Sequence, residues 1–219
     1  MNDFKTSCQK QKLLGEGSTS FDFRESKERI MRQVFDLKFV LDYAANYLNV
    51  DISKVASMGW STGGIVALWL SQMDFRVKAV IGLDGSYMFN DTQLLSKEGI
   101  NEPRPGFPIL SFFRGHERQV GSINHGFIES LDWAERFIIK VPNATHGEFC
   151  DDPYLMDQMK FDWPRKEFNT LEESLKNYYS VIQISKLFLD NLLISGQTLK
   201  ELRNEIEKES KIRGLIFYD

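Results

Sequence analysis

The chain has 219 residues, of which 42% are hydrophobic and 26% are charged, and its formal net charge is −4. This length and composition are typical of one globular domain with a substantial core. The acidic balance and the lack of a basic stripe exclude nucleic acid as an expected partner, and no apolar run approaches the roughly 18 residues of a membrane span.

The N-terminal residues contain no apolar segment of the kind found in signal peptides. The two cysteines, Cys8 and Cys150, are too few for a disulfide framework. Together these features predict reduced thiols and a cytoplasmic location, unless an N-terminal signal precedes the sequence in a longer protein.

Residues 1–23 are polar and contain a cluster of Gly, Ser and Thr, so we expect a loop or a disordered N-terminus followed by one domain over residues 24–219. Apolar spacings of three and four predict helices over 24–48, 63–73 and 171–194, and a charged surface helix over 198–210. Short apolar runs predict strands at 54–58, 77–83, 108–113 and 135–141, with irregular stretches at 86–106 and 147–170. The apolar residues expected on one face of the 171–194 helix are Leu171, Leu175, Tyr178, Ile182, Leu189 and Leu193.

Strands that alternate with helices predict a parallel sheet covered by helices on both faces. In such sheets functional side chains gather beyond the carboxyl ends of the strands. Ser61, Asp84 and His146 each follow the end of a predicted strand, so we expect these three side chains to meet at one edge of the sheet.

The most informative motif is Gly-Trp-Ser-Thr-Gly-Gly at residues 59–64, between a predicted strand and a predicted helix. Gly-x-Ser-x-Gly in this context predicts a nucleophile elbow, a tight turn that exposes the Ser61 hydroxyl above the sheet. Glycines two positions before and after the serine are expected to keep β-carbons out of the turn. The amide of Thr62, at the start of the following helix, is the expected donor to an oxyanion.

A serine hydroxyl needs a base to remove its proton. Of the three histidines, His146 follows the last predicted strand, and the chain order Ser, acid, His of α/β-hydrolases selects it over His116 and His125. Two carboxylates are candidates for the acid. Asp84 follows the strand after the elbow, whereas Glu117 follows the next strand between Arg114 and Arg118, where a surface ion pair is an alternative explanation.

Three segments of the sequence are similar to the platelet-activating-factor acetylhydrolase and dienelactone-hydrolase-like branch of the α/β-hydrolase superfamily. Residues 59–64 resemble the Gly-His-Ser-Phe-Gly-Gly elbow of that family, with Trp60 in place of His. Residues 83–89 resemble its Leu-Asp-x-Trp-Met-Phe segment, and residues 145–151 its Val-His-x-x-Phe-x-Asp segment. The resemblance covers roughly residues 30–155. It implies that Asp84 is the catalytic acid and His146 the base. Trp60, where the family often has His, leaves the expected chemistry unchanged and the substrate range open.

The resemblance also implies strands before the elbow strand that this sequence lacks, since only 53 residues precede Lys54. We therefore expect an α/β-hydrolase-like sheet that is incomplete at its N-terminal side, with the elbow strand on an open edge. A partner or a second copy of the chain is the expected cover for that edge. The loop that provides the second oxyanion donor in α/β-hydrolases is expected to be missing too.

These features predict a serine hydrolase that cleaves small or lipid-like carboxylic esters through an acyl-enzyme on Ser61, with no metal and no organic cofactor. One alternative is a non-catalytic α/β-hydrolase remnant that binds a partner and lacks a complete oxyanion hole. A further alternative is a peptidase or thioesterase that uses the same three residues.

Overall fold

The computed structural model describes residues 23–85, 107–115, 128, 129, 131–159 and 169–218. Their centre is a five-stranded sheet in the order β1-β2-β3-β4-β5. Its strands are β1 (Val55–Trp60), β2 (Val77–Leu83), β3 (Pro108–Arg114), β4 (Glu135–Val141) and β5 (Ile216–Tyr218). The first four are parallel, and β5 pairs antiparallel with β4. The predicted parallel sheet is confirmed, and β5 is an addition that the sequence analysis did not include.

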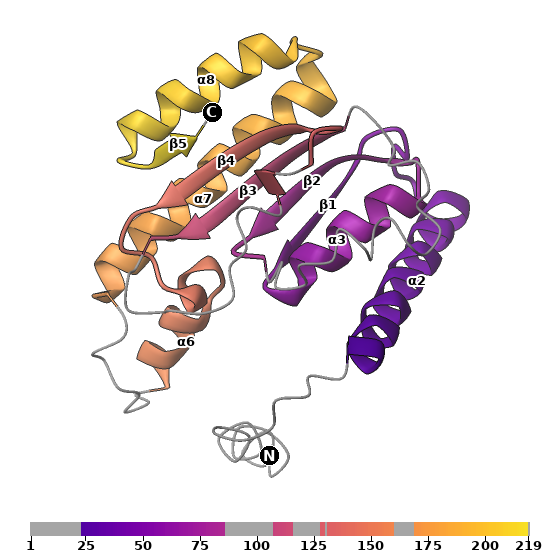
Figure 1. Ribbon diagram of the computed structural model, residues 1–219, viewed down its shortest axis with the longest axis horizontal. Coiled ribbons are helices and arrows are strands. Elements are labelled where there is room, and N and C mark those ends of the chain that lie inside the picture. The colour runs from indigo at the N-terminus through magenta and orange to yellow at the C-terminus, as the bar shows by residue number, and fades with distance from the viewer. Residues whose placement is uncertain (1–22, 86–106, 116–127, 130, 160–168, 219) are drawn as a thin grey trace.

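Helices cover both faces of this sheet (Figure 1). The helices α2 (Phe23–Tyr47) and α3 (Thr62–Met73) lie on one face, and α7 (Leu171–Asp190) and α8 (Leu199–Ile212) lie on the other. A short π-helical segment, η3 (Asn191–Ser195), extends α7. Within the stretch expected to be irregular, the chain forms η1 (His146–Phe149) and α6 (Asp152–Gln158).

Two apolar clusters make the core, one on each face of the sheet. Neighbouring residues of a strand point to opposite faces, and Val80 accordingly packs in the α3 cluster while Ile81 packs in the α7 cluster. Because both central strands, β2 and β3, are buried on both faces, they are almost continuously apolar. The two helix layers therefore enclose the sheet, which carries the residues that follow its strands, such as Ser61 and Asp84.

The buried face of α7 differs from the predicted one. Its fully buried apolar residues are Val181, Ile184 and Phe188, whereas Ile182 is exposed. Small buried side chains, Ser174, Ser180 and Ser185, occupy the remaining positions toward the core. The buried face is thus offset from the predicted apolar face, of which Ile182 is exposed and the other members are only partly buried.

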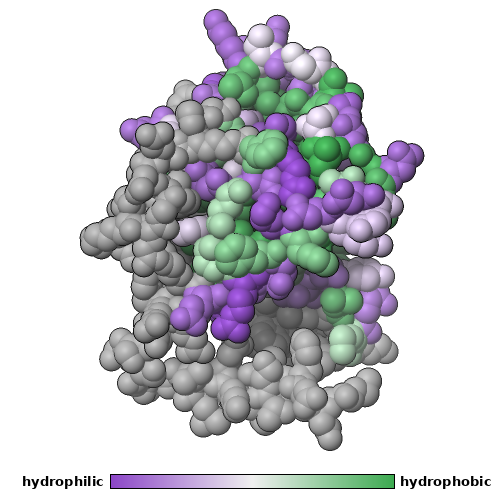
Figure 2. All heavy atoms as spheres, turned by 90° about the vertical axis from the view of Figure 1, so that its right-hand side faces the viewer, coloured by the Kyte–Doolittle hydropathy of each residue, from purple (hydrophilic) through white to green (hydrophobic). Residues whose placement is uncertain are grey.

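The α2 side of the molecule exposes many apolar side chains. Figure 2 views this side and shows green apolar surface among purple polar surface. The large exposed apolar residues of α2 are Phe35, Leu37, Phe39, Val40, Tyr43 and Tyr47. Within the described ranges, β1 pairs with β2 alone. A partner or second copy that covers this edge stays a prediction.

Several expectations concern residues outside the described ranges. They are the loop or disorder of residues 1–22, the 86–106 loop and most of the segment after it up to residue 127, including Glu117. The division into an N-terminal segment and one domain stays a prediction. No helix in the described part of the chain is long and apolar enough to cross a membrane.

Candidate active site

Ser61 lies in a sharp turn between the end of β1 and the start of α3. Its backbone has φ 54° and ψ −124°, a conformation that costs a residue with a β-carbon on the order of 1–3 kcal/mol. The Ser61 amide donates to the carbonyl of Leu83 on β2 at 3.1 Å, and the Ser61 carbonyl accepts from the Gly64 amide at 3.0 Å. These two hydrogen bonds tie the turn to the neighbouring strand β2 and to the first turn of α3.

The two glycines that flank the serine are not equivalent. A β-carbon on Gly59 would lie 2.0 Å from the Gly63 carbonyl oxygen, so any side chain there collides with the backbone of the turn. A β-carbon on Gly63 would meet nothing within 4 Å. The expectation that both glycines keep β-carbons out of the turn is therefore wrong for Gly63, because its backbone lies against Gly59 while the position of its own missing β-carbon is open.

Asp84 follows the last residue of β2 and is buried. Its backbone also has a positive φ, 45°, and its amide donates to the carbonyl of Phe112 on β3 at 2.9 Å. The Arg114 amide donates to Asp84 Oδ1 at 3.1 Å, and Arg114 Nε lies 3.6 Å from Asp84 Oδ2. Arg114, considered above as a neighbour of Glu117, is thus also an ion-pair partner of Asp84.

His146 connects these two residues. Its Nδ1 lies 2.5 Å from Asp84 Oδ2, and its Nε2 lies 3.0 Å from Ser61 Oγ. In the tautomer that carries its proton on Nδ1, the ring donates to the Asp84 carboxylate and leaves Nε2 as the acceptor for the serine hydroxyl. The His146 side chain is 30% exposed, so solvent reaches the imidazole ring that links Ser61 and Asp84.

Trp60 has a contact that the sequence analysis missed. Its indole Nε1 donates to the His146 carbonyl at 2.9 Å. The two rings also stack, with centroids 4.9 Å apart and planes inclined by 29°. Trp60 thus contacts both the backbone and the ring of His146, and the expectation that it leaves the chemistry unaffected stays a prediction.

Thr62 is the first residue of α3 and directly follows Ser61. The amides of a first helical turn have no partner within their own helix, which fits an oxyanion donor, but this role stays a prediction. A second donor is not identified among the described residues. Glu117, His116 and His125 lie outside those residues.

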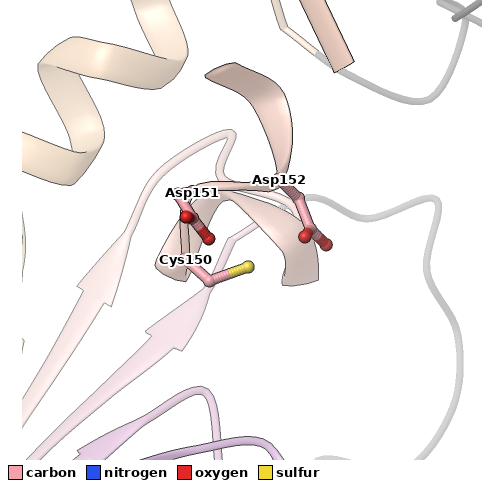
Figure 3. Close-up of side chains that lie close together, drawn as sticks. All are labelled: Cys150, Asp151 and Asp152. Carbon is pink, nitrogen blue, oxygen red and sulfur yellow. The ribbon is translucent and has the colours of Figure 1, made fainter. Parts of the chain in front are cut away.

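A different cluster, Cys150, Asp151 and Asp152, brings its potential ligand atoms within 4.8 Å of one another (Figure 3). Burial raises the pKa of the Cys150 thiol to about 11. The thiol donates to the Gly147 carbonyl at 3.1 Å. Because metals bind the thiolate, a protonated thiol beside two adjacent carboxylates is a weak metal site, and we assign it none.

Comparisons with known proteins inform the fold. No protein-family model and no curated protein matches the sequence. Among solved structures, a ferulic acid esterase from Streptomyces cinnamoneus is similar, with a TM-score of 0.67 and 19% sequence identity. The similarity covers 89% of this chain and 56% of the esterase chain. The chain therefore spans little more than half the length of that structural neighbour.

The similarity supports the predicted fold class. Parallel strands β1 to β4, the turn at Ser61 and the flanking helices form an α/β-hydrolase-like fold. At this sequence identity, the likeness concerns the fold and not the reaction. The resemblance to the acetylhydrolase and dienelactone-hydrolase-like branch stays a prediction.

Proposed function

We propose that the chain is a serine hydrolase that cleaves carboxylic esters, with Ser61 as nucleophile, His146 as general base and Asp84 as the acid. The observation that carries this proposal is the chain of hydrogen bonds from Ser61 Oγ through the His146 ring to Asp84, at 3.0 and 2.5 Å. Its residues come from three different strand ends, and the nucleophile lies in a turn with positive φ. Acyl transfer by a serine nucleophile needs this arrangement of nucleophile, base and acid, which supports the proposal.

In the proposed reaction, Ser61 Oγ attacks the carbonyl carbon of the ester while His146 Nε2 takes the hydroxyl proton. The negative charge moves to the former carbonyl oxygen, near the Thr62 amide at the positive end of α3. Collapse of this intermediate expels the alcohol, which receives the proton from His146, and leaves an acyl group on Ser61. Water activated by His146 then releases the carboxylic acid and restores the serine.

Asp84 has two tasks in this scheme. It accepts the Nδ1 proton of His146, which keeps Nε2 as the acceptor, and its negative charge stabilises the imidazolium that forms. The buried position of Asp84 strengthens this electrostatic effect because little water screens it.

The substrate class rests on weaker support. The structural neighbour is named as a ferulic acid esterase, and the sequence resembles acetylhydrolases and dienelactone hydrolases. Both point to a small or lipid-like carboxylic ester for this chain. Rates of hydrolysis of nitrophenyl esters with acyl groups of increasing length would show which acyl chain the protein prefers. They would also show whether this preference resembles that of acetylhydrolases.

The test is covalent labelling with a fluorophosphonate probe, followed by mass spectrometry of the labelled peptide. We expect one label on Ser61, which Ser61→Ala abolishes. Ser53→Ala is a matched control, because this exposed serine bonds to Asp51 in the turn before β1 and should leave labelling unchanged.

A folded wild-type chain that takes up no label would favour the alternative of a non-catalytic protein. Labelling with turnover of peptides or thioesters but not of oxygen esters would favour the peptidase or thioesterase alternative.

A further inference from the structure

The loop that carries His146 contains a second buried carboxylate, Glu148, which the reaction above does not use. Its exposed fraction is 2%. A carboxylate at such a position is costly unless hydrogen bonds replace its water. Its partners therefore indicate what it does.

Four hydrogen bonds from uncharged groups occupy the two oxygens of Glu148. The Thr145 amide donates to Oε2 at 2.5 Å. Asn169 Nδ2 donates to Oε1 at 2.9 Å and to Oε2 at 3.1 Å. The Ser174 hydroxyl donates to Oε1. Asn169 directly precedes Thr170, the N-cap of α7, and Ser174 lies in the first turns of that helix, so Glu148 ties the η1 loop to the start of α7.

The amide that Glu148 binds belongs to the residue directly before His146. Asn169 Nδ2 also donates to the Asn143 carbonyl at 2.6 Å, where the backbone turns with φ 60°. Asn143 lies three residues before His146, whereas Glu148 lies two residues after it. The loop is thus fastened to the start of α7 on both sides of His146.

Trp60, the last residue of β1, also binds the His146 carbonyl and stacks on its ring. His146 and its loop therefore have contacts with two other parts of the fold, the end of β1 and the start of α7. A misplacement of about 1 Å in such a group can lower a reaction rate about 10²-fold.

We propose that Glu148 is a positioning residue for His146: its buried hydrogen bonds hold the loop so that the imidazole reaches Asp84 and Ser61 together. This inference rests on the proposed function for its catalytic consequence. Its structural content, the orientation of the His146 ring, can be measured without any turnover.

The experiment compares Glu148→Ala, Glu148→Gln and a matched control, Glu201→Ala. Glu201 has the same capping-box arrangement, with Thr198, at the start of α8, remote in the chain from the three site residues. Two quantities are measured on the full chain. One is the downfield proton NMR signal of the His146 Nδ1–H bonded to Asp84, identified by its loss in His146→Ala. The other is the fluorophosphonate labelling rate of Ser61.

We expect Glu148→Ala to remove or broaden the Nδ1–H signal and to slow labelling about 10²-fold, with a folded circular-dichroism spectrum. Glu148→Gln keeps a carbonyl acceptor for the Thr145 amide and should recover part of both losses. Glu201→Ala should change neither quantity, although losing its cap lowers the melting temperature by about 2–4 °C.

A folded Glu148→Ala chain with an unchanged Nδ1–H signal and labelling within about threefold of wild type would overturn the proposal, since the expected effect of misplacement is far larger. If Glu148→Ala does not fold, the same two measurements are made on Asn169→Ala, which removes the hydrogen bonds between Asn169 and Glu148. An unchanged Nδ1–H signal and labelling rate in that variant also overturn the proposal. If the wild type shows the Nδ1–H signal but takes up no label, the proposed function fails, and the signal in the variants still tests the role of Glu148.

Discussion

A buried aspartate lies beside a basic side chain near each end of helix α3: Asp84, which follows β2, near the first end, and Asp74, the C-cap, at the second. At the first end, next to Ser61, Asp84 pairs with the partly exposed imidazole of His146, and both Ser61 and Asp84 have positive φ. At the second end, Asp74 caps the helix with a relaxed φ of −134°. It accepts hydrogen bonds from Arg76 Nε at 2.8 Å and from Lys38 Nζ at 3.4 Å.

The second end fastens α2 to the sheet. Lys38 belongs to α2, and Arg76 also pairs with Asp42 of α2 at 2.6 Å. The hydrogen bonds from Arg76 lower the pKa of Asp74 to about 2. At the second end two cationic side chains, Lys38 and Arg76, pair with Asp74, whereas at the first end Asp84 pairs with the His146 imidazole as well as with Arg114. The second end is therefore an ion-pair link without backbone strain, whereas the first end has strained backbone, which under the proposed function belongs to the active site.

The sharpest test of the first end is Asp84→Asn. Under the proposed function, we expect turnover of a nitrophenyl ester to fall about 10⁴-fold, because the amide favours the wrong tautomer of His146. Glu117→Gln is the control and should change turnover little. If Glu117→Gln abolishes hydrolysis and Asp84→Asn does not, the acid has been assigned to the wrong residue.

A second test separates the two glycines of the elbow. Gly59→Ala should destabilise the chain by about 3 kcal/mol, because its β-carbon cannot fit beside the Gly63 carbonyl without moving backbone. Gly63→Ala has open space and a helical position, so it should stabilise by about 0.5–1 kcal/mol. Urea denaturation of both variants measures the difference. Equal destabilisation would show that the turn needs both glycines.

The second end of α3 is tested by Asp74→Asn. The pKa of this carboxyl is about 2 in the folded chain against 3.8 ordinarily, a difference equivalent to about 2 kcal/mol of stability at neutral pH. Because the folded pKa is the lower one, this contribution is complete above about pH 4 and disappears as the pH falls toward 2. The stability gap between wild type and variant should shrink over that range. The labelling rate of Ser61 at pH 7 should stay unchanged, and a large loss of labelling would contradict the division between the two ends.

The smallest expected effect belongs to Trp60→Phe, which keeps an aromatic ring against His146 but removes the indole donor to its carbonyl. One neutral hydrogen bond is worth about 1 kcal/mol, so the labelling rate should fall about fivefold, while Trp60→Leu, which also loses the stacking, should cost more. A labelling rate for Trp60→Leu equal to that of wild type would show that Trp60 does not help to hold the histidine.

The sequence predicted the parallel strands and most of the helices because these depend on local apolar patterns. It also predicted that Ser61, Asp84 and His146 each lie beyond the carboxyl end of a parallel strand, and the structure has these three side chains in one chain of hydrogen bonds. Their catalytic roles stay predictions. Glu148 was within reach of sequence reasoning, since Thr145-x-x-Glu148 has the spacing of a capping box.

What the sequence determined by itself was the set of local structures: a strand, a Gly-x-Ser-x-Gly turn and a helix, repeated strand–helix alternation, and caps such as Thr170 with Glu173. Tertiary structure alone decided which face of α7 is buried, that β5 joins β4, and that Trp60 contacts a residue 86 positions away. The physical reason is the range of the interactions. Periodicity and capping act over a few residues and leave a pattern in the sequence, whereas packing joins distant segments whose side chains carry no local sign of their partners.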